Sequence, residues 1–102
     1  MKLLIVTAIK EDLQALSIIM ENAGVAVFSV SETVGHKTIH KDYMPDNWFG
    51  KTGDGTDAVF LFSFTENEKA EKVLALVTKY NQDTATSFPI HAFILPVEKA
   101  TL

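Results

Sequence analysis

The sequence predicts one α+β domain, a four-stranded antiparallel sheet with two helices on one face. Three observations predict it: segments rich in β-branched and aromatic residues, segments with apolar residues at helical spacing, and the order in which the two kinds alternate. The chain has 102 residues, 47% of them hydrophobic, and no cysteine. These values are typical of a globular domain without disulfides or zinc–thiolate sites, so residues 1–102 are interpreted as a single domain.

The first half of the chain predicts a strand, a helix and a second strand. Residues 3–8 are apolar on both alternating faces, as in a strand that is covered on both sides. Residues 11–22 carry an apolar stripe at helical spacing, and Gly24 lies where a left-handed cap ends many helices. The stripe consists of Leu13, Leu16, Met20 and Ala23. Residues 25–33 are rich in β-branched residues and predict the second strand.

The second half predicts a strand, a helix and a final strand. Residues 58–64 are aliphatic and aromatic, as expected of a third strand. Thr65 and Glu68 form a capping-box pattern, which predicts a second helix that runs to about Tyr80. Its inward-facing residues are Ala70, Val73, Leu74 and Val77. Residues 88–97 predict a fourth strand, with a proline near each end where ladder hydrogen bonds are not needed.

The resulting order, βαββαβ, is that of the ferredoxin-like split βαβ fold. Right-handed crossovers place both helices on the same face of the sheet. The other face is apolar as well, because Phe60, Phe62 and Phe64 alternate with Val59 and Leu61. At roughly 25 cal/mol per Å² of apolar area, exposure of this face to water favours association by many kcal/mol. We therefore expect copies of the chain to assemble through it.

A polar segment without helical or strand periodicity separates the second and third predicted strands. It spans residues 35–57 and carries two of the three histidines, the only tryptophan and four of the five glycines. Connections longer than about 15 residues are uncommon in compact domains and are usually functional or disordered. The sequence therefore predicts that this long insertion carries function.

Composition excludes several classes of function. The net charge of −4 and the pI of about 5.2 argue against a nucleic-acid-binding protein and against a polybasic membrane anchor. No apolar run approaches the roughly 20 residues of a membrane span, so we expect no direct membrane insertion. The apolar N-terminal run leads into charged residues without a cleavage-type region, which indicates a cytoplasmic protein. No spacing of Ser, His and Asp specifies a catalytic triad, and we predict no enzyme.

Two stretches of the chain are similar to a known family. Residues 22–35 read Asn-Ala-Gly-Val-Ala-Val-Phe-Ser-Val-Ser-Glu-Thr-Val-Gly, and residues 93–100 read Phe-Ile-Leu-Pro-Val-Glu-Lys-Ala. The first resembles the E-x-G-x-x-G-M-T-V-S-E-V-K-G passage of the PII nitrogen regulatory proteins, a family of signal transduction proteins and enzyme regulators. The second matches that family's F-V-S-P-V-E-D-A at five of eight places. The segment 35–57 lies where the family has its T-loop.

The resemblance implies a homotrimer with its sheets lining the core and with effector clefts between subunits. It implies that loop 35–57 docks on a membrane transporter or a metabolic enzyme. The effector-binding residues that it implies are Ser29, Gly35, His36, Lys37 and His91. Within the loop, Tyr43, Trp48 and Phe49 are aromatic, the residue type that anchors protein interfaces, and we predict that they dock on the partner. The alternative is that Trp48 and Phe49 pack back onto the domain and pin the loop.

The family's phosphate-binding motifs are missing from this chain. Where the family has G-F-G-R-Q at the base of the loop, this chain reads Gly35-His36-Lys37-Thr38-Ile39. The family's B-loop, T-G-K-I-G-D-G-K, aligns with residues 84–91, which contain neither glycine nor lysine. We therefore expect ATP or ADP binding to be weak or lost, and the effector stays unknown.

Two other functions stay open. His36, His40 and Asp42 supply imidazole and carboxylate groups that divalent metals prefer. A related ferredoxin-like trimer family is associated with divalent-cation tolerance, so metal binding is the alternative. A further interpretation is an assembly module whose loop fastens it to one constant partner.

Overall fold

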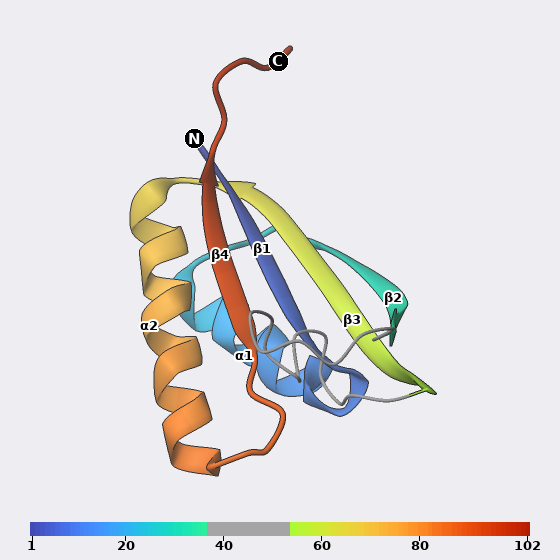
Figure 1. Cartoon of the computed structure of the whole chain (residues 1–102). Coiled ribbons are helices and arrows are strands. Elements are labelled where there is room, and N and C mark those ends of the chain that lie inside the picture. The colour runs from blue at the N-terminus through green and yellow to red at the C-terminus, as the bar shows by residue number, and fades with distance from the viewer. Residues whose placement is uncertain (37–53) are drawn as a thin grey trace.

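Four strands form one antiparallel sheet, and two helices pack against one of its faces (Figure 1). The structure is a computed structural model that describes residues 1–36 and 54–102, without the side chains of residues 54–56. The elements are β1 (Lys2–Ile9), the short 3₁₀ helix η1 (Lys10–Asp12), α1 (Leu13–Ala23), β2 (Ser29–His36), β3 (Asp54–Thr65), α2 (Asn67–Thr84) and β4 (His91–Pro96). This βαββαβ order is the predicted one, and it is compatible with a ferredoxin-like fold.

The strands lie in the order β2-β3-β1-β4, and every neighbouring pair is antiparallel. The two central strands are therefore β3 and β1, and the two edges are β2 and β4. Leu3 of β1 pairs with Phe64 of β3 on one side and with Leu95 of β4 on the other. Strand direction consequently alternates across the whole sheet, from one edge to the other.

The face of the sheet toward the helices forms the hydrophobic core. Leu4 and Val6 of β1 and Leu61 of β3 are completely buried, in one cluster with residues of both helices. The predicted helical stripes are confirmed. Their buried members are Leu16, Met20, Ala23, Ala70, Val73 and Val77, and Leu13 and Leu74 pack against this cluster.

The predicted end of the first helix is confirmed, whereas the predicted start of the second is wrong. Gly24 has φ of 82°, and its N–H bonds to the carbonyl of Glu21 at 3.0 Å. The capping box of Thr65 and Glu68 does not form, because β3 continues through Thr65. Helix α2 begins at Asn67, and its N-cap, Glu66, makes no side-chain capping hydrogen bond.

The second and third strands lie closer together in the chain than the sequence predicts. Gly35 and His36 belong to β2, and residues 54–57 belong to β3, so the two ends of the predicted insertion are paired strands with a bulge between Gly35 and His36. The sequence predicts that residues 25–28 begin the second strand, but they are not part of it, because β2 begins at Ser29. One reason is that Ser63 Oγ donates to the carbonyl of Val27 at 2.6 Å, where a ladder bond would otherwise form.

The second helix and the fourth strand also differ from their predicted bounds. Helix α2 runs to Thr84, four residues beyond Tyr80, and ends at Ala85, which has φ of 47°. Strand β4 begins at His91 because the backbone of the preceding residue, Ile90, bonds to the side chain of Asn81. Within the described ranges, no helix is both long and apolar enough to cross a membrane.

Candidate functional site at the two edges of the sheet

A groove of about 490 Å³ lies along the β4 edge of the sheet, beside α2. Residues 90–93 line one wall. The other wall comes from α2 and includes Leu74, Ala75 and Thr78, of which Ala75 and Thr78 are exposed. Because β4 is an edge strand, the side of it that faces away from β1 has no neighbouring strand in the described part of the chain. Such an edge accepts an extended segment, and the groove beside it accepts side chains.

Two side chains of α2 hold the groove in shape. Asn81 Nδ2 donates to the carbonyl of Ile90, and the N–H of Ile90 donates to Asn81 Oδ1, both at 2.9 Å. One residue earlier in the sequence, Tyr80 donates to Asp12 Oδ1 at 2.9 Å, which ties α2 to η1. The amide of Asn81 therefore takes the place of a neighbouring strand at Ile90 and fixes where β4 starts.

The opposite edge, β2, presents valines that the helices leave uncovered. Val30 pairs with Leu61, a core residue, so its side chain is on the helix side of the sheet. Val30 is nevertheless 40% exposed, and Val34, on the same side, is 49% exposed. The helices therefore do not extend over this edge strand.

Between these two valines, the charge of Glu32 is paired. Lys10 Nζ lies 2.8 Å from Glu32 Oε1. Hydrogen bonding and charge attraction from Glu32 raise the pKa of Lys10 above its usual value. Charged side chains on an edge strand usually discourage pairing with another strand. Here the carboxylate of Glu32 already has the Lys10 cation beside it. The charge of Glu32 therefore opposes pairing with another strand less than the sequence of β2 suggests.

The sheet face away from the helices carries a row of aromatic rings. Phe60 and Phe62 have ring centroids 6.2 Å apart, and Phe62 and Phe64 stand edge to face at 6.3 Å. Phe64 is 57% exposed, and Leu95 of β4, on the same face, is 39% exposed. This open face, as we call it, is therefore apolar from the central strands to the β4 edge, as predicted.

The structure places four of the predicted effector-binding residues on opposite edges. Ser29 begins β2, Gly35 and His36 end it, and His91 begins β4. Two strands, β3 and β1, lie between these edges, which puts them three strand spacings or about 14 Å apart. The described part of one chain therefore does not bring the β2 residues together with His91.

The other predicted site residues lie outside the described residues. They are Lys37, His40, Asp42, Tyr43, Trp48 and Phe49. Of the predicted metal ligands, the structure places only His36, which is exposed at the end of β2. In the described ranges, no group of three His, Asp or Glu residues is placed to hold a metal ion. The metal site stays a prediction from the sequence.

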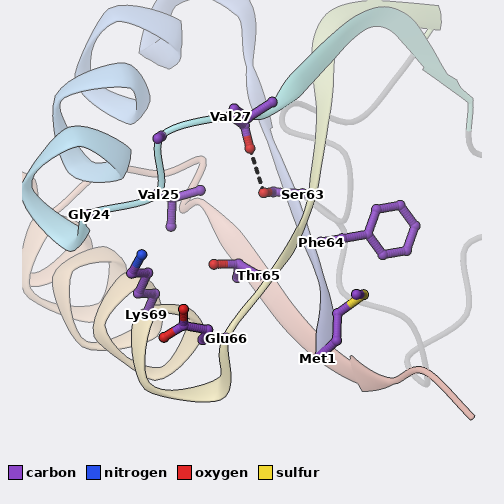
Figure 2. A pocket seen from close by; sticks show the side chains of 10 residues that line it. Met1, Gly24, Val25, Val27, Ser63, Phe64, Thr65, Glu66 and Lys69 are labelled. Carbon is purple, nitrogen blue, oxygen red and sulfur yellow. Dashed lines mark hydrogen bonds between the residues drawn. The ribbon is translucent and has the colours of Figure 1, made fainter. Parts of the chain in front are cut away.

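Another cavity, of about 400 Å³, lies at the far end of β3, and we call it the notch (Figure 2). It is lined by Met1, residues 24–27, residues 63–66 and Lys69. Strand β2 begins opposite Phe62, so residues 63–65 of β3 have no ladder partner on that side. The bond from Ser63 Oγ to Val27 bridges the gap. The polar Ser63 within a run of phenylalanine and leucine was the signal in the sequence that points to the notch.

Comparison with known proteins does not assign the chain to a family. No protein-family model matches it, and a search of curated proteins finds no match. The features that bear on function are therefore the two sheet edges, the open face and the sequence motifs.

Proposed function

We propose that this chain is a PII-like regulatory protein that assembles head to tail into a ring and binds a small effector between its copies. The edge β2 of one copy pairs with the edge β4 of the next. The trimeric state of the ring comes from the family resemblance, whereas the head-to-tail contact comes from the two edges. Contacts of this heterologous type form closed rings when the rotation between copies closes.

The observation that carries the proposal is the complementarity of the two edges. Val30 and Val34 are exposed on the helix side of β2, and the groove beside β4 opens on the helix side of the opposite edge. When the sheet continues from one copy to the next, the valines enter the groove and pack on Leu74 and Ala75. Edge pairing supplies backbone hydrogen bonds, and the groove supplies apolar contact.

Strand direction supports the same contact. Strand β2 runs antiparallel to β3, and β4 runs antiparallel to β1, so the direction alternates from β2 to β4. A second copy that continues the sheet in the same orientation places its β2 antiparallel to β4. No strand has to reverse, and the antiparallel pattern continues through every copy of the ring.

The open face supports a closed ring rather than an extended sheet. A sheet that curves into a ring with the helices outside buries its inner face. That face carries Phe60, Phe62 and Phe64 together with aliphatic residues of β1 and β4. Their removal from water favours closure by roughly 25 cal/mol per Å² of apolar area.

The effector site follows from the same contact. Across the antiparallel pairing of β4 with a neighbouring β2, His91 at the start of β4 lies near Gly35 and His36 at the end of the next copy's β2. The cleft between them is therefore made by two copies, which accounts for the position of these three residues on opposite edges. Ser29 begins β2, so it lies at the other end of the same contact, near Pro96. We propose that the action on a transporter or enzyme uses loop 35–57, and this part of the proposal is argued from the sequence alone.

The assembly is tested by sedimentation velocity on the wild type, on Val30→Lys/Val34→Lys and on Gln82→Lys. Gln82 is exposed on α2 and does not line the groove, so its substitution is a matched control for added charge. We expect a trimer for the wild type and the control, and a monomer with unchanged far-ultraviolet circular dichroism for the double variant. A monomeric wild type, or a double variant that still assembles, would contradict edge pairing.

A further inference from the structure

We infer that the notch at the end of β3 is a docking site for residues 97–102 of a neighbouring copy. The inference depends on the proposed ring, because the ring is what brings this segment to the notch. The occupant is an extended segment of a second copy rather than a small molecule, and three features of the structure argue for it.

The first feature is the shape of the notch. Residues 63–65 continue β3 past the start of β2, so their backbone on this side has no ladder partner in the described part of the chain, and the cavity lies beside it. Figure 2 shows Phe64 and Met1 on one side of it and Lys69 of α2 on the other. An unpaired stretch of strand next to a cavity is the arrangement to which an extended segment adds as a further strand.

The second feature is the direction and reach of residues 97–102. After β4 the chain leaves the sheet without secondary structure and projects past its end (Figure 1). In the proposed ring, β4 lies beside the neighbour's β2 and runs toward the residue at which that β2 begins, Ser29. The segment therefore leaves β4 where the neighbouring sheet has its gap. Six extended residues span about 20 Å, more than the roughly 10 Å of three residues of β3.

The third feature is the match of side chains. Ala92 and Ile94 are on the helix side of β4, because they pair with Val6 and Leu4. Continued alternation puts Glu98 on the helix side and Val97 and Lys99 on the open-face side. Each side then meets a suitable neighbour in the notch.

On the helix side, Glu98 meets Lys69. The side chain of Lys69 is partly buried over Gly24, where an added Cβ would lie 3.7 Å from Lys69 Cε. Lys69 makes no ion pair with any residue that the structure describes. A carboxylate from a second copy supplies the missing counter-charge.

On the open-face side, Val97 meets exposed apolar side chains. Met1 and Phe64 are each 57% exposed, and Val27, at the rim, is 80% exposed. Three large apolar groups that stay in water at one cavity are a docking surface for another apolar group. In the segment itself, Leu102 is fully exposed and Val97 is half-buried.

Disulfide trapping tests the inference directly, because the natural chain has no cysteine. Val27→Cys and Lys99→Cys in the same chain place one thiol at the notch rim and one on the segment. A disulfide forms only when the two Cα atoms come within about 7 Å. Under mild oxidation we expect covalent dimers and trimers on a non-reducing gel. The matched control, Val27→Cys/Gln82→Cys, should stay a single chain.

Charge reversal tests the contact between Glu98 and Lys69. Adding Lys69→Glu to the cysteine pair should slow crosslinking by roughly threefold, the effect of losing one exposed ion pair. Adding Glu98→Lys as well should restore the rate. A rate that neither change alters would overturn this contact.

The same gels separate the inference from the proposed ring. An assembled protein that forms no disulfide overturns notch docking and leaves edge pairing intact. A disulfide within one chain, seen as a faster-migrating monomer, shows that the segment occupies its own notch and also overturns the inference. A wild type that sediments as a monomer overturns both.

Discussion

The side-chain amide of Asn81 makes a pair of hydrogen bonds with the backbone of Ile90. Asn81 Nδ2 donates to the carbonyl of Ile90, and Asn81 Oδ1 accepts from its N–H, at 2.9 Å each. The two residues are separated by nine positions, across the connection from α2 to β4. A side chain of the helix thus bonds to the strand as a neighbouring strand would, at the point where the groove begins.

Asn81→Ala should destabilise the protein by about 2–3 kcal/mol, because the N–H and C=O of buried Ile90 lose both partners. Urea denaturation followed by circular dichroism measures this. Asn81→Asp keeps the acceptor and loses the donor, so its loss should be smaller at neutral pH. Gln82→Ala, one residue away and exposed, should change the free energy of unfolding by less than about 0.5 kcal/mol. Equal effects at both positions would contradict a specific role for Asn81.

Tyr80 gives the protein a stability that depends on alkaline pH. Burial raises the pKa of Tyr80 above its ordinary value of 10.0, and the hydrogen bond to Asp12 and the charge of Asp12 raise it further. The folded state therefore favours the neutral phenol. Its contribution is fully present below pH 10.0 and is lost as the pH rises through the raised pKa of the folded state.

Tyr80→Phe should lower the free energy of unfolding by about 1 kcal/mol at neutral pH, the usual net value of one hydrogen bond. The difference between wild type and variant should shrink above pH 10.0. Urea denaturation at several pH values on both sides of this point measures it. A difference that is constant with pH would show that the phenol does not titrate as described.

Gly24→Ala should destabilise the protein by about 1 kcal/mol through backbone strain alone. Gly24 has φ of 82°, where an L side chain is unfavourable, yet an added Cβ would meet no atom closer than 3.7 Å. Gly24→Asn is the matched comparison, because asparagine tolerates the left-handed region better than alanine. Thermal unfolding should therefore rank the three proteins as wild type, Gly24→Asn, Gly24→Ala. A reversed order of the two variants would point to contacts rather than to φ.

A mixed-assembly experiment tests whether the effector cleft belongs to two copies. Titration calorimetry with ATP, ADP, AMP and cyclic dinucleotides first identifies the nucleotide that binds with the highest affinity. Neither His36→Ala nor His91→Ala should bind it. Unfolded and refolded together, the two variants should recover about a quarter of the sites, because some clefts then pair an intact β2 with an intact β4.

The alternative outcomes of that mixture are equally informative. No recovery in the mixture, with both variants still assembled, would mean that His36 and His91 do not share a cleft. Full binding by either single variant would remove that histidine from the site. Micromolar, magnesium-dependent ATP binding by the wild type would contradict the expectation from the missing phosphate-binding motifs.

The element order was predictable because hydrophobic periodicity is local, whereas several boundaries depend on contacts that are distant in sequence. Val25–Phe28 look like strand by composition, but Ser63, 36 residues from Val27, bonds to it and replaces a ladder bond. Thr65 and Glu68 fit a capping box, but β3 extends through Thr65. The backbone of Thr65 is therefore paired in the sheet and does not cap the helix. In each case a long-range partner overrode a correct local preference.

The candidate site was predictable only in part, for a related reason. The topology that the sequence predicts already puts Ser29 and His36 on one edge and His91 on the other. The groove beside β4 could not be predicted, because it depends on how far α2 extends sideways over the sheet. The exposure of Val30 depends on the same sideways position, since a valine on the helix side of a strand is normally buried.

The two uncovered edges of the sheet also affect whether assembly of the chain stops at a closed ring or continues into a filament. A head-to-tail contact grows indefinitely when the curvature between copies does not return to the first one, and the product is then a filament. If the chain forms the proposed ring, substitutions that flatten the sheet, far from either edge, are expected to turn the closed particle into fibres. The same two surfaces would serve a discrete regulator and an aggregate, and the twist of the strands between them would decide which one forms.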